Sequence, residues 1–109
     1  MTYNFSVIRG EWAVVRLPPG EAMPHWSLSP IEFTSITRTS DELSIVCPAS
    51  MVPDGQRAEQ DWTLLKLHGP FQFDQVGVLA SFATPLAEAK ISILAVSTFD
   101  TDCILVKAS

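Results

Sequence analysis

The segment STFDTDCILV, Ser97 to Val106, places two carboxylates, Asp100 and Asp102, between apolar runs. Carboxylates in such a position can pair with the ammonium group or a basic side chain of a ligand. Asp and Thr are also ordinary in tight turns, because their side chains hydrogen-bond nearby backbone groups. The sequence therefore leaves a binding site and a solvated turn both open, and the binding hypothesis depends mainly on Asp102.

The histidines and cysteines offer other chemistry. His68 could in principle join the two carboxylates in an acid-base set, but no Ser or Cys has a context that activates a nucleophile, and no G-x-x-x-x-G-K phosphate loop is present. Cys47, Cys103, His25 and His68 are scattered, without the close ligand pairs of a zinc site. Both cysteines lie in apolar runs, which suits reduced thiols in a core, although a disulfide stays open. We expect no enzyme activity, no metal and no cofactor.

The composition indicates one small domain, or two half-size units that share a core. Of the 109 residues, 47% are hydrophobic and 17% charged, which argues against disorder. The net charge of -5 repels phosphate backbones, so we expect no nucleic-acid partner. No apolar run approaches the roughly 20 residues of a membrane span, and the N-terminus does not resemble a signal peptide. We expect a cytoplasmic protein without a membrane partner.

Short β-prone runs separated by turn residues dominate the chain. We expect strands at Tyr3 to Ile8, Trp12 to Leu17, Phe33 to Arg38, Leu43 to Cys47, Trp62 to His68, Ser92 to Ser97 and Cys103 to Val106. The first two flank Arg9-Gly10-Glu11 and predict a hairpin. Prolines between residues 18 and 30 forbid a long helix there and allow at most a short helical turn.

One helix is expected in the second half of the chain. Apolar residues recur at helical spacing from Val76 to Ala89, after Asp74, which can cap the helix. Pro85 lies inside this pattern and predicts a kink or a restarted turn. The polar residues 51–60, which include a proline and a glycine, form the best linker candidate.

Two pairs of segments indicate an internal repeat. EWAVVRLPPG (Glu11 to Gly20) aligns with DWTLLKLHGP (Asp61 to Pro70), and ITRTSDELSIV (Ile36 to Val46) aligns with VSTFDTDCILV (Val96 to Val106). We infer a degenerate half at 1–50, with an extra N-terminal strand and its main helix lost. A linker at 51–60 leads to a second half at 61–109, built as strand-helix-strand-strand.

A right-handed strand-helix-strand crossover places its two strands parallel, with a gap that the third strand fills. The predicted fold class is therefore α+β: a ferredoxin-like fold in two duplicated halves, with mostly antiparallel sheets and one main helix. The second helix and last strand of such a unit are absent after Lys107. The strand at Trp62 then exposes an edge unless the first half or a second subunit covers it, and a homodimer would do so.

The segments EFTSITRTSDELSIVCP and GPFQFDQVGVLASFATPLAEAKISILAVSTFDTDCILV, with the paired tryptophan strands, resemble the ACT-domain family. The likeness is greatest to the atypical tandem-ACT branch, which takes in small bacterial ACT proteins, the regulatory domains of aspartokinases and the CASTOR arginine sensors. The resemblance implies a non-catalytic regulatory module that binds an amino acid or other small metabolite at an interface between ACT units. The alternatives are an assembly module without ligand and, less favoured, a small acid-base enzyme.

Carried over by position, the resemblance implies ligand-binding residues in two segments. The loop before the helix supplies Gly69, Pro70, Phe71, Asp74, Gln75, Gly77 and Val78. The facing turn supplies Ser97, Thr98, Phe99, Asp100 and Asp102, with Thr39 to Glu42 as the first-half counterparts. Backbone N–H groups near the start of the helix suit a ligand carboxylate. Turn geometry at the glycines and a plain N-cap at Asp74 are the simpler interpretations.

Overall fold

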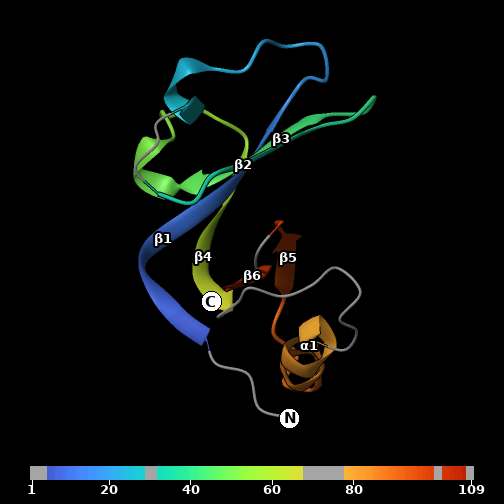
Figure 1. Cartoon of the computed structure of the whole chain (residues 1–109). Helices are drawn as coiled ribbons and strands as arrows, with labels where there is room; N and C mark the ends of the chain where they lie inside the picture. Colours follow the sequence, from blue (N-terminus) through green and yellow to red (C-terminus); the bar gives the residue numbers. More distant parts are fainter. Residues whose placement is uncertain (1–4, 29–31, 68–77, 100–101, 108–109) are drawn as a thin grey trace. The chain divides into compact units, whose positions relative to one another are not determined.

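The structure is a computed structural model that describes residues 5–28, 32–67, 78–99 and 102–107 (Figure 1). Its elements in chain order are β1 (Phe5–Leu17), η1 (His25–Leu28), β2 (Ser35–Arg38), β3 (Leu43–Pro48), η2 (Ala49–Met51), β4 (Ala58–Leu67), α1 (Val78–Glu88), β5 (Ile93–Ser97) and β6 (Asp102–Lys107). The η elements are short 3-10 helices. Hydrogen bonds join the strands in the order β2-β3-β1-β4-β6-β5.

The chain divides into two compact units. The N-terminal unit is Gly10–Asp61, and the C-terminal unit combines the residues up to Arg9 with those from Trp62 onward. The strands β1 and β4 each contribute residues to both units. Halves at 1–50 and 61–109, with a linker at 51–60, stay a prediction about domain organisation.

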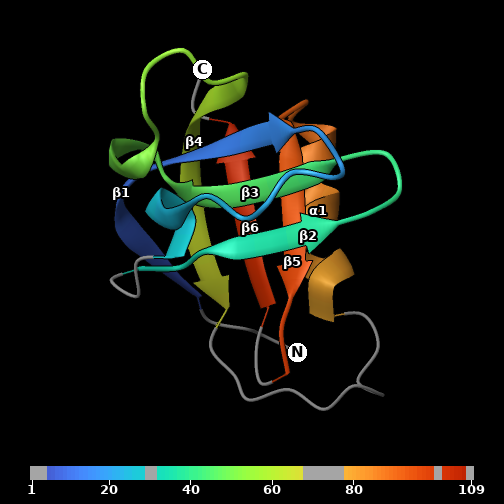
Figure 2. The same ribbon diagram turned by 90° about the horizontal axis from the view of Figure 1, so that it is seen from above.

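Each unit builds the same order of three strands. In the N-terminal unit β3 pairs antiparallel with β1, from Trp12↔Pro48 to Leu17↔Leu43, and on its other side with β2. In the C-terminal unit β6 pairs antiparallel with both β4 and β5. Figure 2 shows β3 between β1 and β2, and β6 between β4 and β5. The third strand therefore lies in the middle, as predicted, and the mostly antiparallel α+β class is confirmed.

Alternation along these strands builds the core of the N-terminal unit. Val15, Ile45 and Cys47 are fully buried on one face of the sheet. Half-buried side chains from η1, η2 and the start of β4 pack against them, among them Trp26 and Met51. The Pro-rich segment thus contributes a single short helical turn, as its sequence predicts, and this turn supplies part of the cover that the core needs.

The core of the C-terminal unit lies between its sheet and α1. Leu67 and Ile104 are fully buried, and Leu86 of α1 packs against them together with apolar side chains of β4, β5 and β6. Cys103, Ile104 and Leu105 are buried in succession. Because successive strand residues point to opposite faces, these residues of β6 are covered on both faces, which is typical of a continuous apolar run.

The helix α1 continues through Pro85 as a single element. It ends where Lys90 adopts a left-handed conformation, with φ of 60°. The Lys90 N–H donates to the Ala87 carbonyl at 3.0 Å, and the Ile91 N–H donates to the Leu86 carbonyl at 2.9 Å. These two bonds are those of a Schellman motif, which satisfies carbonyl groups that the last helical turn leaves unpaired.

The two tryptophans at repeated positions take different environments. Trp12 is 1% exposed, and its indole Nε1 donates to the Phe33 carbonyl at 3.0 Å. Trp62 is half-buried, and the Lys107 ammonium lies 5.2 Å from the centre of its ring. That distance is within the range of a cation–π contact. Trp12 thus acts as a core anchor.

The predicted hairpin at Arg9-Gly10-Glu11 is wrong, because β1 is one continuous strand. Gly10 has φ of 111° and lies within the strand. A glycine with positive φ can mark a bulge as well as a turn, and the local sequence does not distinguish the two. β4 likewise begins at Ala58, inside the range predicted as linker, and carries a positive φ at Asp61. With β1 extended, it is β1 that lies beside β4 and covers its edge.

Replacement of Gly10 with alanine tests the positive φ at this position of β1. The added Cβ would meet Trp12 only at ordinary contact distance, 3.5 Å, so the cost arises from the backbone conformation. We expect Gly10→Ala to lower the free energy of unfolding by more than about 1 kcal/mol in urea denaturation. The matched control is Gly20→Ala, where nothing lies within 4 Å and no positive φ is required. Equal stability of the two variants would contradict this account.

Candidate functional site

The strand ends that flank the predicted ligand segments lie at one end of the sheet in the C-terminal unit. β4 ends at Leu67, and Lys66 pairs with Cys103 near the start of β6. β5 ends at Ser97, which pairs with Asp102. Because β6 runs antiparallel to both β4 and β5, the last residues of β4 and β5 and the first residues of β6 lie at the same end of the sheet. The strand ends that flank both predicted ligand segments are therefore close together.

Five of the predicted site residues are described, and one of them, Ser97, is the last residue of β5. Val78 is the first residue of α1, and Asp102 is the half-buried first residue of β6. Thr98 and Phe99 follow β5, and the Phe99 side chain is 77% exposed. The other predicted residues lie outside the described part of the chain: Gly69, Pro70, Phe71, Asp74, Gln75, Gly77 and Asp100. His68 lies outside it as well. A ligand site at these positions stays a prediction.

The first-half counterpart of this turn has a structural role. The Thr39 hydroxyl accepts hydrogen bonds from the N–H groups of Asp41 and Glu42, at 3.1 and 3.2 Å. The Thr39 N–H donates to the Glu42 carbonyl at 2.9 Å, and the Arg16 guanidinium donates to the Asp41 carbonyl at 3.0 Å. These bonds close the connection between β2 and β3, as side-chain hydroxyls often do in turns. The turn interpretation therefore accounts for Thr39 and Asp41.

Asp102 also acts on the cysteine that follows it. Burial raises the pKa of the Cys103 thiol above its usual value, the Lys66 charge lowers it, and the Asp102 charge raises it. Cys47 is buried too, and burial raises the pKa of its thiol to about 11. Both thiols are free. Thiols that stay protonated are poor nucleophiles, so these two cysteines serve as small core residues.

The buried Cys47 thiol makes stability depend on pH in the alkaline range. In the unfolded chain the thiol ionises near its ordinary pKa of 9.0, whereas in the folded chain it keeps its proton until about pH 11. Unfolding therefore releases a proton between these values, and the free energy of unfolding falls as pH rises through them. We expect a steeper fall in the wild type than in Cys47→Ala, which lacks the ionisable thiol. Parallel curves from urea denaturation would contradict the assignment.

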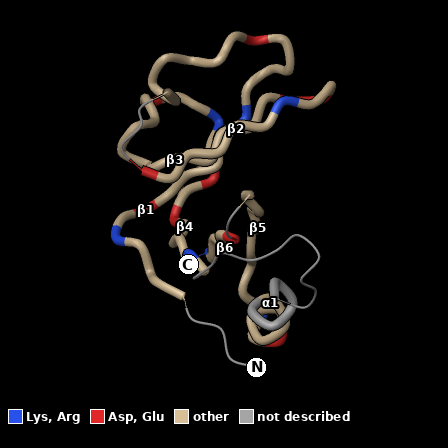
Figure 3. The backbone as a smooth tube through the Cα atoms, viewed as in Figure 1, with Lys and Arg blue, Asp and Glu red and all other residues tan. Residues whose placement is uncertain are grey.

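Strand pairing also gathers charged residues that their sequence separation hides. A hollow of about 220 Å³ in the N-terminal unit is lined by Arg16, Glu42, Arg57 and Glu59, with apolar side chains of β1 and β4 beneath. Figure 3 shows acidic and basic stretches interspersed in this unit. No pattern in the sequence indicated this grouping, and the pairing of β1 with β3 brings Arg16 near Glu42.

Among the described residues, no three His, Cys, Asp or Glu side chains gather as metal ligands. No helix in that part of the chain is long and apolar enough to span a membrane.

Two protein-family models each match part of the chain. A model described as an ACT domain matches residues 57–109, and a model described as an N-terminal domain matches residues 10–55. A search of curated proteins finds no significant match.

Two crystal structures share nearly the whole fold. Protein Atu0741 from Agobacterium tumefaciens is 40% identical, with a TM-score of 0.89 over 97% of this chain and 78% of that one. A protein of unknown function from Vibrio cholerae, VC0802, described as a possible transport protein, is 25% identical, with a TM-score of 0.76 over 96% of this chain and 78% of that one. The chain therefore belongs to one family with the Agobacterium protein, and its residues 57–109 are similar to an ACT domain.

Proposed function

We propose that the chain is a non-catalytic regulatory protein that binds an amino acid or a similar small metabolite. The observation that carries the proposal is the ACT-domain match over residues 57–109. The described part of this region has the strand-helix-strand-strand order β4-α1-β5-β6. The paired ends of its strands at Ser97 and Asp102 support a ligand position between the loop at residues 69–78 and the turn at residues 97–102.

The chemistry of a free amino acid suits the residue types in these two segments. Its carboxylate needs N–H donors, and the first turn of α1 has backbone N–H groups without partners inside the helix. Its ammonium group needs an anion, which Asp102 at the start of β6 can supply. In this proposal Gly77 lets a ligand approach the backbone, and Asp74 and Asp100 add negative charge.

We also propose that the two units arose by tandem duplication, so that the N-terminal unit is a second ACT-like unit. The common strand order β1-β3-β2 and β4-β6-β5 supports this idea. The short turn η1 then stands where the main helix has been lost. Two such units, in one chain or in two, would supply the interface between ACT units at which the ligand binds.

A thermal-shift screen against the twenty amino acids tests the binding proposal. A ligand that binds only the folded state raises the melting temperature by mass action. We expect at least one amino acid at millimolar concentration to do so, and Asp102→Asn to abolish the shift. The matched control Asp54→Asn, an exposed carboxylate of the N-terminal unit, should leave the shift intact. A screen with no shift would reject amino-acid binding and favour an assembly role.

Exposed apolar residues favour assembly as a homodimer. Phe5 and Val7 lie on one face of β1 and are 47% and 64% exposed. Exposed apolar side chains that lie side by side are typical of surfaces that contact another protein. A dimer formed through this surface is compatible with ligand binding.

Static light scattering measures the assembly directly. We expect twice the mass of the 12.0 kDa chain, and a shift towards the mass of one chain in Val7→Glu, because a buried carboxylate without a partner opposes association. Thr37→Glu places the same charge on an exposed position of β2 and should stay dimeric. A wild-type mass of one chain would rule out the dimer.

A further inference from the structure

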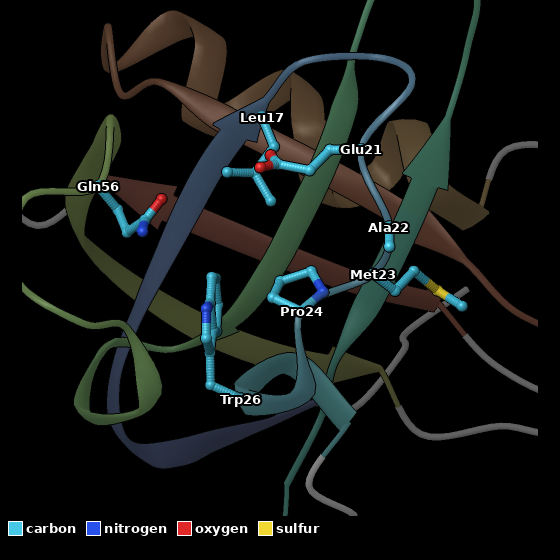
Figure 4. A pocket seen from close by; sticks show the side chains of 7 residues that line it. All are labelled: Leu17, Glu21, Ala22, Met23, Pro24, Trp26 and Gln56. Carbon is cyan, nitrogen blue, oxygen red and sulfur yellow. The ribbon is translucent and has the colours of Figure 1, made fainter.

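A larger cavity lies in the N-terminal unit and shares no residue with the proposed ACT site. Its volume is about 440 Å³, and it is lined by the end of β1, by the segment before and within η1, and by Gln56 (Figure 4). Cavities of this size are typical of small-molecule sites. The residues that line it are separated along the chain, so the fold rather than one local motif assembles it.

The floor and one wall of this cavity are apolar. Leu17 ends β1, and Pro24 and Trp26 lie side by side across from it (Figure 4). Trp26 and Leu17 both pack against the buried cluster of Val15, Ile45 and Cys47. The indole ring is therefore held by the core, while part of its surface is left to the cavity.

Hydrogen bonds hold the Pro-rich segment that forms the rim. Ser27 is 2% exposed, and both its N–H and its hydroxyl donate to the Pro24 carbonyl, at 3.0 and 2.6 Å. The Glu21 N–H donates to the Pro18 carbonyl at 3.2 Å, and the Arg38 guanidinium donates to the Pro19 carbonyl. A rim fixed in this way does not need to be ordered by a ligand, which favours binding.

Two polar groups point into the cavity. Figure 4 shows the Glu21 carboxylate reaching in above Leu17 and the Gln56 carboxamide pointing in from the opposite side. No basic side chain is among the lining residues. The Glu21 carboxylate makes no ion pair within the described part of the chain. The cavity thus combines one negative charge, a carbonyl acceptor and an aromatic ring.

We propose that this cavity binds a small organic ammonium ion with a short apolar body. The carboxylate of Glu21 neutralises the cation, and the Gln56 carbonyl oxygen can accept a hydrogen bond from an N–H or O–H group of the ligand. Trp26 adds attraction, since indole attracts cations more strongly than the other aromatic side chains. Leu17 and Pro24 take the apolar part of the ligand. The net charge of -5 raises the local concentration of cations and lowers that of anions.

Isothermal titration calorimetry with choline and with n-butylammonium tests this proposal on the full chain. We expect at least one of the two cations to bind and to shift the NMR signal of the Trp26 indole N–H. This signal is assigned as the one that is missing from the spectrum of Trp26→Phe. The neutral isostere of choline, with a tert-butyl group in place of trimethylammonium, should bind more weakly. Absence of binding by both cations, or equal binding of the neutral isostere, would overturn the proposal.

Variants at two exposed glutamates test whether the Glu21 carboxylate is the group that binds the cation. Glu21→Gln should weaken cation binding by about threefold or more, a modest factor because the carboxylate is exposed. Glu32→Gln makes the same change of charge on an exposed residue outside the cavity and should leave affinity unchanged. Equal affinity of Glu21→Gln and the wild type would sink the assignment. Asp102→Asn should leave cation binding intact, so this site and the ACT site can fail independently.

Discussion

The fold depends on the pairing of two short buried strands, β3 and β6, on both of their sides. Every residue from Ile45 to Cys47 and from Cys103 to Leu105 is buried. Backbone N–H and C=O groups removed from water must find partners, and a central strand satisfies them on both sides. This requirement places the third strand of each unit between the other two. It also brings the end of β5 at Ser97 and the start of β6 at Asp102 together at one end of the sheet.

The same arrangement has different chemistry in the two units. In the N-terminal unit the hydroxyl of Thr39 and the guanidinium of Arg16 close the turn between β2 and β3. In the C-terminal unit Asp102 begins the strand as a half-buried carboxylate beside the end of β4. The same strand order thus ends in a structural turn in the N-terminal unit and in a candidate binding site in the C-terminal unit, because residues in loops and at strand ends vary more than residues in the core.

Much of the fold could be predicted from residue patterns. Apolar runs located β2, β3, β5 and β6 within two residues, and helical spacing located α1 although Pro85 lies inside it. Gly10 shows where such reasoning fails, because a turn and a bulge require the same positive φ. The candidate ACT residues came from the family resemblance rather than from spacing. The cavity at Glu21 and Trp26 was missed, because Gln56 and Leu17 reach it from distant parts of the chain.

Apolar and polar patterning was sufficient to determine β2, β3, β5 and β6, the helix, the buried thiols and the central place of each third strand, because these follow from burial and from backbone hydrogen bonding. Contacts distant in sequence decided three things: the continuity of β1 through Gly10, the pairing of β1 beside β4, and the grouping of Glu21, Trp26 and Gln56 around one cavity. The physical reason is that apolar periodicity depends on the local sequence alone. Whether the chain turns at a glycine, and whether side chains surround a cavity, depends on the strands and loops that pack beside it.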